Sequence, residues 1–214
     1  HDQNVMRIDQ TDDLHFDNCH WLGAYVNQTG QTSGNSLVEL FGTVAVPTKR
    51  IHFTGCTFEG LEYAVESSDN IEDIVFSSCE FLKLYRAIQL AEFSDGSTAN
   101  KTIGPTGVVI FASRFDLIDA EAIKIFDNGG TPRGNIVAGC SFRDVGKNSD
   151  DSAELPEISF LHGNNRSDNN FFHRTDVQSH FEGTVYHESP VRSPSTLNDN
   201  ASSLTAYQPE YFPR

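Results

Sequence analysis

The side chains with the clearest chemical potential are three carboxylates, Asp116, Asp119 and Glu121, with Glu59 and Glu62 at a similar place earlier in the chain. Paired carboxylates on one face can serve as general acid and base, or as nucleophile, in glycoside hydrolysis. The chain has 30 Asp and Glu against 15 Lys and Arg, so acidic corners are also expected simply as solvated surface. We predict no catalytic residues, with a carboxylate site as the alternative.

The four cysteines, Cys19, Cys56, Cys79 and Cys140, raise the questions of metal binding and disulfide formation. Zinc sites favour close pairs such as Cys-x-x-Cys, whereas the nearest two cysteines here are 23 residues apart. Neighbouring parallel strands would point their side chains the same way, which makes the disulfide dihedral hard to reach. We predict free, buried and inert thiols, which suit a reducing cytoplasm.

Four late histidines, His162, His173, His180 and His187, are the remaining residues with metal-binding chemistry. A metal site would require separate loops to converge on them, so the sequence predicts neither a metal nor a cofactor. They are expected at corners and in loops. The run 163–170, GNNRSDNN, is predicted as a turn, because asparagine accepts left-handed backbone angles.

These residues are positioned by a repeated frame, apolar-x-apolar-x-x-small-x-apolar. It starts at Leu14, Ile51, Ile74, Val108, Asn135 and, more weakly, Asn170. The small position holds the four cysteines, Ser113 in the fourth frame and Thr175 in the last. Alternate residues of a strand share one face, so each frame predicts two short strands joined by a two-residue corner.

The residue before the small position also supports a corner. It is Asn18, Gly55, Ser78, Ala112, Gly139 and Arg174 in the successive frames. Glycine and asparagine, which occupy half of these positions, are the residues that best tolerate a left-handed backbone.

A strand-corner-strand unit that recurs every 23 to 37 residues is the signature of a solenoid. A third apolar stretch follows the second, third and fourth frames, at 64–65, 87–90 and 122–125. Three short strands per turn describe a three-sided coil. Polar inserts at 27–36, 95–106 and 146–156 are rich in turn residues and are predicted to be loops that leave its wall.

The stacked cysteine, aromatic and aliphatic positions resemble those of right-handed parallel β-helices of the pectate-lyase-like superfamily. Like residues one rung apart in such a coil repeat at about 4.8 Å. The resemblance covers residues 14–186 and implies an all-β fold with three short strands per rung and about six to seven rungs. We assign residues 1–188 to one β-helix domain. This architecture hosts lyases, hydrolases, epimerases, adhesins and viral spikes, so it implies no single function.

The catalytic motifs of polygalacturonases are not matched. That family carries an Asn-Thr-Asp strand, a paired Asp, Gly-His-Gly and Arg-Ile-Lys, in this order. Here the Ile-Lys pair at 123–124 precedes the Asp pair at 150–151, and no Asn-Thr-Asp is present. His162 is followed by glycine but preceded by Leu161.

Pectate lyases make a second comparison. They need clustered aspartates for calcium and a catalytic arginine on the same wall. Arg86 and Arg114 are the candidate arginines, but the adjacent frames supply no aspartate ladder beside them.

The net charge of −15 would repel a polyanionic partner, and no basic patch is evident. No apolar run approaches the ~20 residues that cross a bilayer, and residues 1–20 lack the basic-then-apolar order of a secretion signal. We therefore expect neither nucleic-acid binding nor membrane insertion.

The segment 189–214 has a different character. Its end carries Tyr207, Tyr211 and Phe212 between prolines, which remove backbone donors and hold a chain extended. Disordered segments are normally poor in aromatic residues. We predict an extended C-terminal arm that docks on the coil or on a partner through these three rings.

The resemblance implies a non-enzymatic structural or receptor-facing component of a viral particle, such as a bacteriophage tail spike, tail fibre or baseplate protein. Its expected partners are other virion proteins or copies of itself, as in a homotrimer, and a cell-surface glycan. Such a protein assembles in the host cytoplasm and resides in the virion, with an extracellular location as the alternative. The rival functions are a polysaccharide depolymerase, either lyase or hydrolase, and a glycan-binding β-helix.

Overall fold

The protein is an all-β, right-handed parallel β-helix with three strands per rung and six rungs, as predicted. The computed structural model describes residues 5–24, 35–43, 45–68, 70–90, 105–125, 133–146, 157–173 and 181–186, with residues 68, 133, 161–164 and 181–186 described by backbone alone. The predicted arm at 189–214 lies outside this part of the chain, and the boundary at 188 stays a prediction. None of the described segments forms a helix long and apolar enough to cross a membrane.

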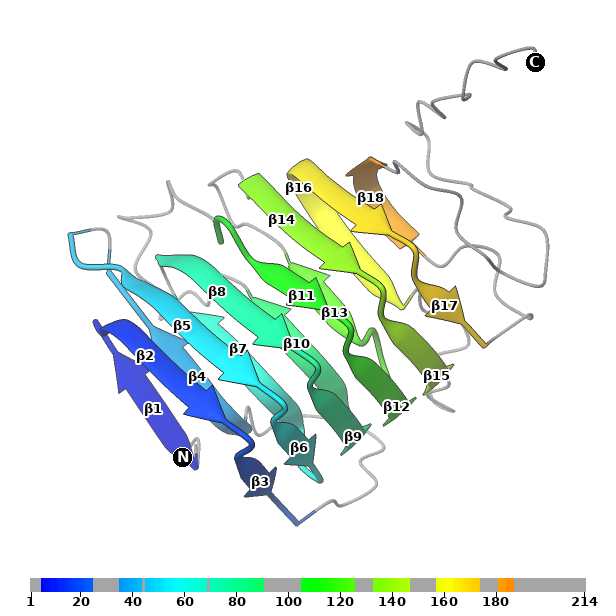
Figure 1. Cartoon of the computed structure of the whole chain (residues 1–214), viewed down its shortest axis with the longest axis horizontal. Coiled ribbons are helices and arrows are strands. Elements are labelled where there is room, and N and C mark those ends of the chain that lie inside the picture. The colour runs from blue at the N-terminus through cyan, green and yellow to red at the C-terminus, as the bar shows by residue number, and fades with distance from the viewer. Residues whose placement is uncertain are drawn as a thin grey trace.

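The strands stack in three columns that wind along the coil (Figure 1). Column 1 contains β2 (Asp12–Asp17), β5 (Thr48–Thr54), β8 (Ile71–Ser77), β11 (Val109–Phe111), β14 (Arg133–Ala138) and the second half of β16 (Ile158–Asp168). Column 2 contains β3 (His20–Leu22), β6 (Thr57–Glu59), β9 (Glu80–Leu84), β12 (Arg114–Ile118), β15 (Ser141–Val145) and β17 (Phe171–Phe172). Column 3 contains β1 (Met6–Asp9), β4 (Ser36–Phe41), β7 (Tyr63–Ser68), β10 (Arg86–Leu90), β13 (Ile123–Ile125), the first half of β16 and the start of β18 (Phe181–Tyr186), whose end pairs with the second half of β16.

One rung therefore runs from column 3 through column 1 to column 2. The first rung comprises β1, β2 and β3, and the sixth comprises β16, which spans two columns, and β17. The third apolar stretches predicted from the sequence form the column 3 strands β7, β10 and β13. Every strand pairing is parallel, as a coil with one direction of winding requires.

The corner between columns 1 and 2 is the most regular part of the coil. Two residues separate the strands there, and the first has a φ between 49° and 62° in each rung, at Asn18, Gly55, Ser78, Ala112, Asn169 and Gly139. At Gly55 a Cβ would approach Asn18 Oδ1 to 2.6 Å, so glycine also makes room for its neighbour. The corner residues still donate their N–H to the next rung, which offsets the cost of the left-handed backbone.

The core is a set of stacked side chains. Trp21, Phe58, Phe81, Phe115, Phe142 and Phe172 form one continuous column of rings, with centroids 4.7–5.0 Å apart. Phe16, Phe53 and Phe76 form a second stack against it, 5.0–5.1 Å apart. These distances follow the spacing of neighbouring strands, so one aromatic residue at the same frame position in each rung fills the interior.

The last frame lies five residues earlier than predicted. Phe171 and Phe172 pair with Ser141 and Phe142, so Asn170 occupies the ladder position of Cys140 and Asn169 is the left-handed corner. Thr175 and Arg174, predicted for these two roles, lie outside the described residues. The run 163–170 was predicted as a turn, but the strand β16 continues through it to Asp168.

The reason for this error is that the sixth rung has a polar interior. Asn165, Ser167 and Asn170 are fully buried at positions that hold apolar side chains or cysteine in most earlier rungs, the exceptions being Asn135 and Ser113. Asn170 Oδ1 accepts a hydrogen bond from Cys140 N at 2.8 Å, and its Nδ2 donates to Val137 O at 3.0 Å. Buried amides are stable there because their hydrogen bonds are satisfied, although in sequence they look like a loop.

Candidate functional site

The carboxylate Asp116 lies on the outer face of column 2 and is held by two arginines. Its Oδ1 accepts a hydrogen bond from Arg143 Nε at 2.8 Å, and its Oδ2 lies 2.7 Å from Arg114 Nη2. Asp116 is buried, whereas both guanidinium groups are about half exposed. Hydrogen bonds from Arg143 and Arg114 outweigh burial and lower the pKa of Asp116. Asp116 is therefore ionised at neutral pH and unsuited to act as a general acid.

Glu121 forms a second ion-pair cluster, in column 3 just before β13. Its Oε2 accepts hydrogen bonds from Arg86 Nη2 at 2.5 Å and Nε at 3.0 Å, and Lys124 Nζ lies 3.2 Å from its Oε1. Arg86 also donates to Gln89 and lies over the ring of Tyr85, 5.3 Å from its centroid. Burial alone would raise the pKa of Glu121, but the charges of Arg86 and Lys124 outweigh it and lower the pKa.

The predicted carboxylate set is thus divided between two walls. Asp116 belongs to a strand of column 2, Glu121 precedes a strand of column 3, and Asp119 lies in the corner between β12 and β13. The arginines that looked isolated in sequence, Arg86 and Arg114, each bind one of these carboxylates. The arrangement does not pair two carboxylates across a common substrate position.

The two earlier glutamates also differ from each other. Glu59 lies on the column 2 wall, where its Oε1 accepts a hydrogen bond from Lys83 Nζ at 2.6 Å. Glu62 is buried next to column 3 and accepts a hydrogen bond from Asn35 N at 3.3 Å. Both are tied to neighbouring rungs by polar contacts.

Arg143, the main partner of Asp116, was missed in the sequence, although the frame contains the necessary signal. Asp116 is the ninth residue of the fourth frame and Arg143 the ninth of the fifth, so the repeat alone places them on adjacent rungs. His173 occupies the same position in the corrected sixth frame and is exposed, and its Nε2 lies 3.1 Å from Ser141 Oγ.

The cysteines lie at the predicted corner positions, but Cys19 is not buried as predicted. All four are free; Cys56, Cys79 and Cys140 are buried, and Cys19 in the first rung is half-buried. The thiols of Cys56 and Cys79 each donate to a backbone carbonyl of the rung below, at 3.3 Å. Burial raises the pKa of Cys79 to about 11 and that of Cys140 to about 12, so neither provides a thiolate nucleophile at neutral pH.

The described ranges contain no cluster of residues that could hold a metal ion. No group of three or more His, Cys, Asp or Glu there has metal-binding geometry. Outside these ranges lie residues 150–151, His180, His187 and the side chain of His162. Lys124, from the Ile-Lys pair that resembles a polygalacturonase motif, is engaged with Glu121.

The long intervals between described strands all border column 3. They separate β3 from β4, β10 from β11, β13 from β14, and β15 from β16. The predicted inserts fall in three of these intervals, mostly outside the described residues. Loops that carry function tend to vary in length on a constant scaffold, so the wall of column 3 is where such segments attach.

The first rung is the part of the coil whose core is open. Five of the six hydrophobic residues that pack against the core while only partly buried belong to it, namely Met6, Leu14, Phe16, Cys19 and Trp21. Their second-rung counterparts Ile51, Phe53, Cys56 and Phe58 are completely buried. Val5 and Leu22 at the same end are 59% and 65% exposed, which extends the apolar surface beyond the core positions.

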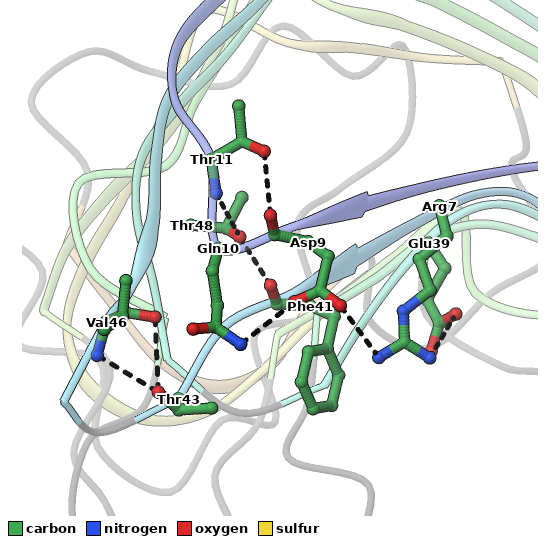
Figure 2. A network of polar contacts seen from close by, with 9 residues as sticks. All are labelled: Arg7, Asp9, Gln10, Thr11, Glu39, Phe41, Thr43, Val46 and Thr48. Atoms are coloured by element: carbon green, nitrogen blue, oxygen red, sulfur yellow. Dashed lines mark hydrogen bonds and ion pairs between the residues drawn. The ribbon is translucent and has the colours of Figure 1, made fainter.

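Polar contacts connect the corner between β1 and β2 with the second rung (Figure 2). Thr48 Oγ1 donates to Phe41 O at 2.5 Å, and Thr11 Oγ1 donates to Asp9 O at 2.9 Å. Arg7 lies over the ring of Phe41 at 4.1 Å and pairs with Asp9 at 3.5 Å. This corner of the first rung is therefore held by polar contacts.

Comparisons with known proteins give no relative. No protein-family model matches the sequence, and no curated protein or solved structure is significantly similar to it. Strand register and stacking define the fold, and the surfaces described above carry the information on function.

Proposed function

We propose that the chain is a non-enzymatic structural component of a larger assembly, of the kind that virions use in bacteriophage tail spikes, tail fibres or baseplates. The observation that carries this proposal is the separate neutralisation of the candidate carboxylates. Asp116 is bound by Arg114 and Arg143 on one wall, and Glu121 by Arg86 and Lys124 on another. Glycosidases need two carboxyl groups with different pKa values facing one bond, and these two groups both have lowered pKa values.

The virion context is supported by the resemblance of the frames to viral β-helices. In this proposal the protein assembles in the host cytoplasm and resides in the particle, in contact with other virion proteins or with further copies of itself. An extracellular depolymerase of the same fold is the rival.

Turnover assays distinguish a structural protein from a depolymerase. The purified chain is incubated with bacterial capsules, O-antigens and pectins, and the products are examined for new reducing ends and for unsaturated sugars. We expect neither. Turnover that is lost in Asp116→Asn or Glu121→Gln, in variants whose circular dichroism is unchanged, would establish the depolymerase instead.

One observation favours glycan binding as a second candidate function. Phe171 is 51% exposed on the column 2 wall, next to Ser141 and two residues from the exposed His173. An exposed ring beside polar groups is a usual platform for a sugar face. Binding to a glycan array that is lost in Phe171→Ala, but kept in Phe111→Ala, would support it; Phe111 is the matched control, because it is 41% exposed on column 1. Equal loss in both variants, or no binding by either protein, would count against it.

A further inference from the structure

One patch on the column 2 wall combines an exposed ring with polar side chains from the adjacent strand. Its side chains point outward from the fifth and sixth rungs, because they alternate with the inward Phe142 and Phe172. This column 2 patch consists of Ser141, Arg143, Phe171 and His173. Adjacent strands lie about 4.8 Å apart and alternate residues of a strand about 6.7 Å apart, so the patch is comparable in size with a single sugar ring.

Phe171 supplies the apolar part of the column 2 patch. Its ring is 51% exposed, and β17 pairs it with Ser141 on the adjacent strand. The N–H of His173 donates to Phe142 O at 3.0 Å, which places His173 beside Arg143, and its Nε2 lies 3.1 Å from Ser141 Oγ. An aromatic platform with a hydroxyl, an imidazole and a guanidinium group beside it matches a sugar, which has an apolar C–H face and a polar edge.

The exposed ring of Phe111 on column 1 lacks such neighbours. Phe111 is 41% exposed, and its partners on the adjacent strands are Ser77 and Ala138, neither of which is charged. Exposure of an aromatic ring is therefore common to both walls, whereas the combination of ring and charged side chains belongs to the column 2 patch.

The charges around the column 2 patch are already compensated within the protein. Asp116, which is ionised, accepts hydrogen bonds from Arg143 and from Arg114. The charge of Asp144 also acts on Arg143, and Glu80 Oε1 lies 3.8 Å from Arg114 Nη1. Three carboxylates thus accompany two guanidinium groups, and the net charge of the chain is −15. An acidic sugar would find no excess of positive charge at this wall, even if the neighbouring imidazole were protonated.

We propose that the column 2 patch binds an uncharged hexose unit of a glycan. The C–H face of the sugar stacks on Phe171. Its hydroxyl groups form hydrogen bonds with Ser141, His173 and Arg143. The bonds from Arg143 to Asp116 come from Nε and Nη2 and leave other N–H donors of the guanidinium group for a ligand. This inference rests on glycan binding as a candidate function and adds the class of sugar and its contacts.

Matched oligosaccharides test the class of sugar. The probes are oligomers of glucose, galactose and mannose, and the corresponding oligomers of glucuronate, galacturonate and mannuronate, titrated into the full chain by calorimetry. We expect at least one neutral oligomer to bind at least about tenfold more tightly than its uronate counterpart, with an affinity that salt changes little. Phe171→Ala should weaken this binding by at least about tenfold, and Phe111→Ala should leave it unchanged.

A charge variant tests why the neutral sugar is preferred. Asp116→Asn removes the carboxylate that compensates Arg143 and Arg114, so the affinity for the uronate oligomers should rise about threefold or more at low salt. Glu59→Gln is the matched control, because it removes a carboxylate from the same wall in the second rung, three rungs from Arg143. It should leave the affinities for both classes unchanged. Circular dichroism of both variants should be that of the parent.

Four results would overturn the proposal. Equal or tighter binding of a uronate oligomer by the parent would assign the patch to acidic glycans, and binding that survives Phe171→Ala would place the sugar elsewhere. Unchanged uronate affinity in Asp116→Asn would mean that charge does not select the sugar. Absence of binding by every oligomer would remove the site. None of these results affects the proposed structural role, which fails only if the glycan is cleaved.

Discussion

The first and sixth rungs of this coil place opposite chemistry at equivalent ladder positions. In the first rung Cys19 occupies the corner and Phe16 the neighbouring strand, both half-buried. In the sixth, Asn170 and Ser167 occupy these positions and are fully buried. The apolar first rung is open, and the polar sixth rung, on which β18 stacks, is buried.

The difference shows that the same ladder position can hold either apolar or polar side chains. A rung of apolar side chains extends the core and presents a surface on which something else must stack. Asn170 instead uses its amide to bind Cys140 N, Val137 O and Ser167 Oγ, so the side chain satisfies the buried polar groups around it. The polar rung is satisfied internally, and β18 stacks on it as a further strand.

The largest effect expected from this comparison is on the stability contributed by the ring stack. Phe81 has a stacked ring on each side, whereas Trp21 has a stacked ring on one side alone among the described residues. Phe81→Ala should lower the free energy of unfolding by about 3–5 kcal/mol through loss of burial and formation of a cavity, and Trp21→Ala by about 1–2 kcal/mol. Urea denaturation followed by circular dichroism measures both. Equal costs would mean that the first rung is as buried as the centre.

The next test compares the two ends directly at one ladder position. Asn170→Ala should cost about 2–3 kcal/mol, because it leaves Cys140 N and Val137 O buried without their partner. Cys19→Ala removes a half-buried thiol and should cost less than about 1 kcal/mol. Thermal unfolding of the two variants gives the order, and a more damaging Cys19→Ala would reverse our account of the ends.

A smaller effect is expected from the ion pairs of Asp116, which lie on the column 2 wall between the first and sixth rungs. Because the folded-state pKa of Asp116 lies below its ordinary value of 3.8, its ion pairs stabilise the fold above pH 3.8, and this contribution is lost as the pH falls through the lowered pKa. Asp116→Asn should cost about 1 kcal/mol or less at pH 7, since its partners are half exposed, and progressively less in acid.

Arg143→Gln is the companion variant for this pH dependence. It removes the largest cause of the lowered pKa, so the loss of stability on acidification should become shallower. Denaturation curves at a series of pH values test this, and an unchanged acid profile in both variants would show that Asp116 is not the group responsible.

Most of the fold could be predicted because cysteine and aromatic residues recur at the same frame positions, where they stack from rung to rung. The cysteine at the corner and the phenylalanine two residues later predict the strand register of rungs two and three. Ser113 takes the place of cysteine in the fourth rung with the same register. The sixth rung was misplaced because Asn165, Ser167 and Asn170 carry no hydrophobic signal. Only the folded structure brings their polar groups together inside the coil, where they are hydrogen-bonded.

The surface clusters were less predictable than the core. Arg143 was within reach of sequence reasoning, since the frame places it one rung from Asp116. The pairing of Arg86 with Glu121 was not, because Glu121 lies outside the frame, in a corner whose length differs from rung to rung. Burial of the ion pairs also had no signature in an acidic chain whose carboxylates are expected to be solvated.

The central claim, a coil that is open at its first rung and sealed beyond it, can be measured with the ladder cysteines. Thiol labelling of the native, dilute protein, followed by mass spectrometry, reports rungs one, two, three and five from one chemical group. We predict that Cys19 is labelled first, Cys56 and Cys79 more slowly, and Cys140 only on unfolding, because burial raises the pKa of Cys140 to about 12. Labelling of Cys140 as fast as Cys19, or recovery of fewer than four thiols after denaturation without reductant, would contradict the account.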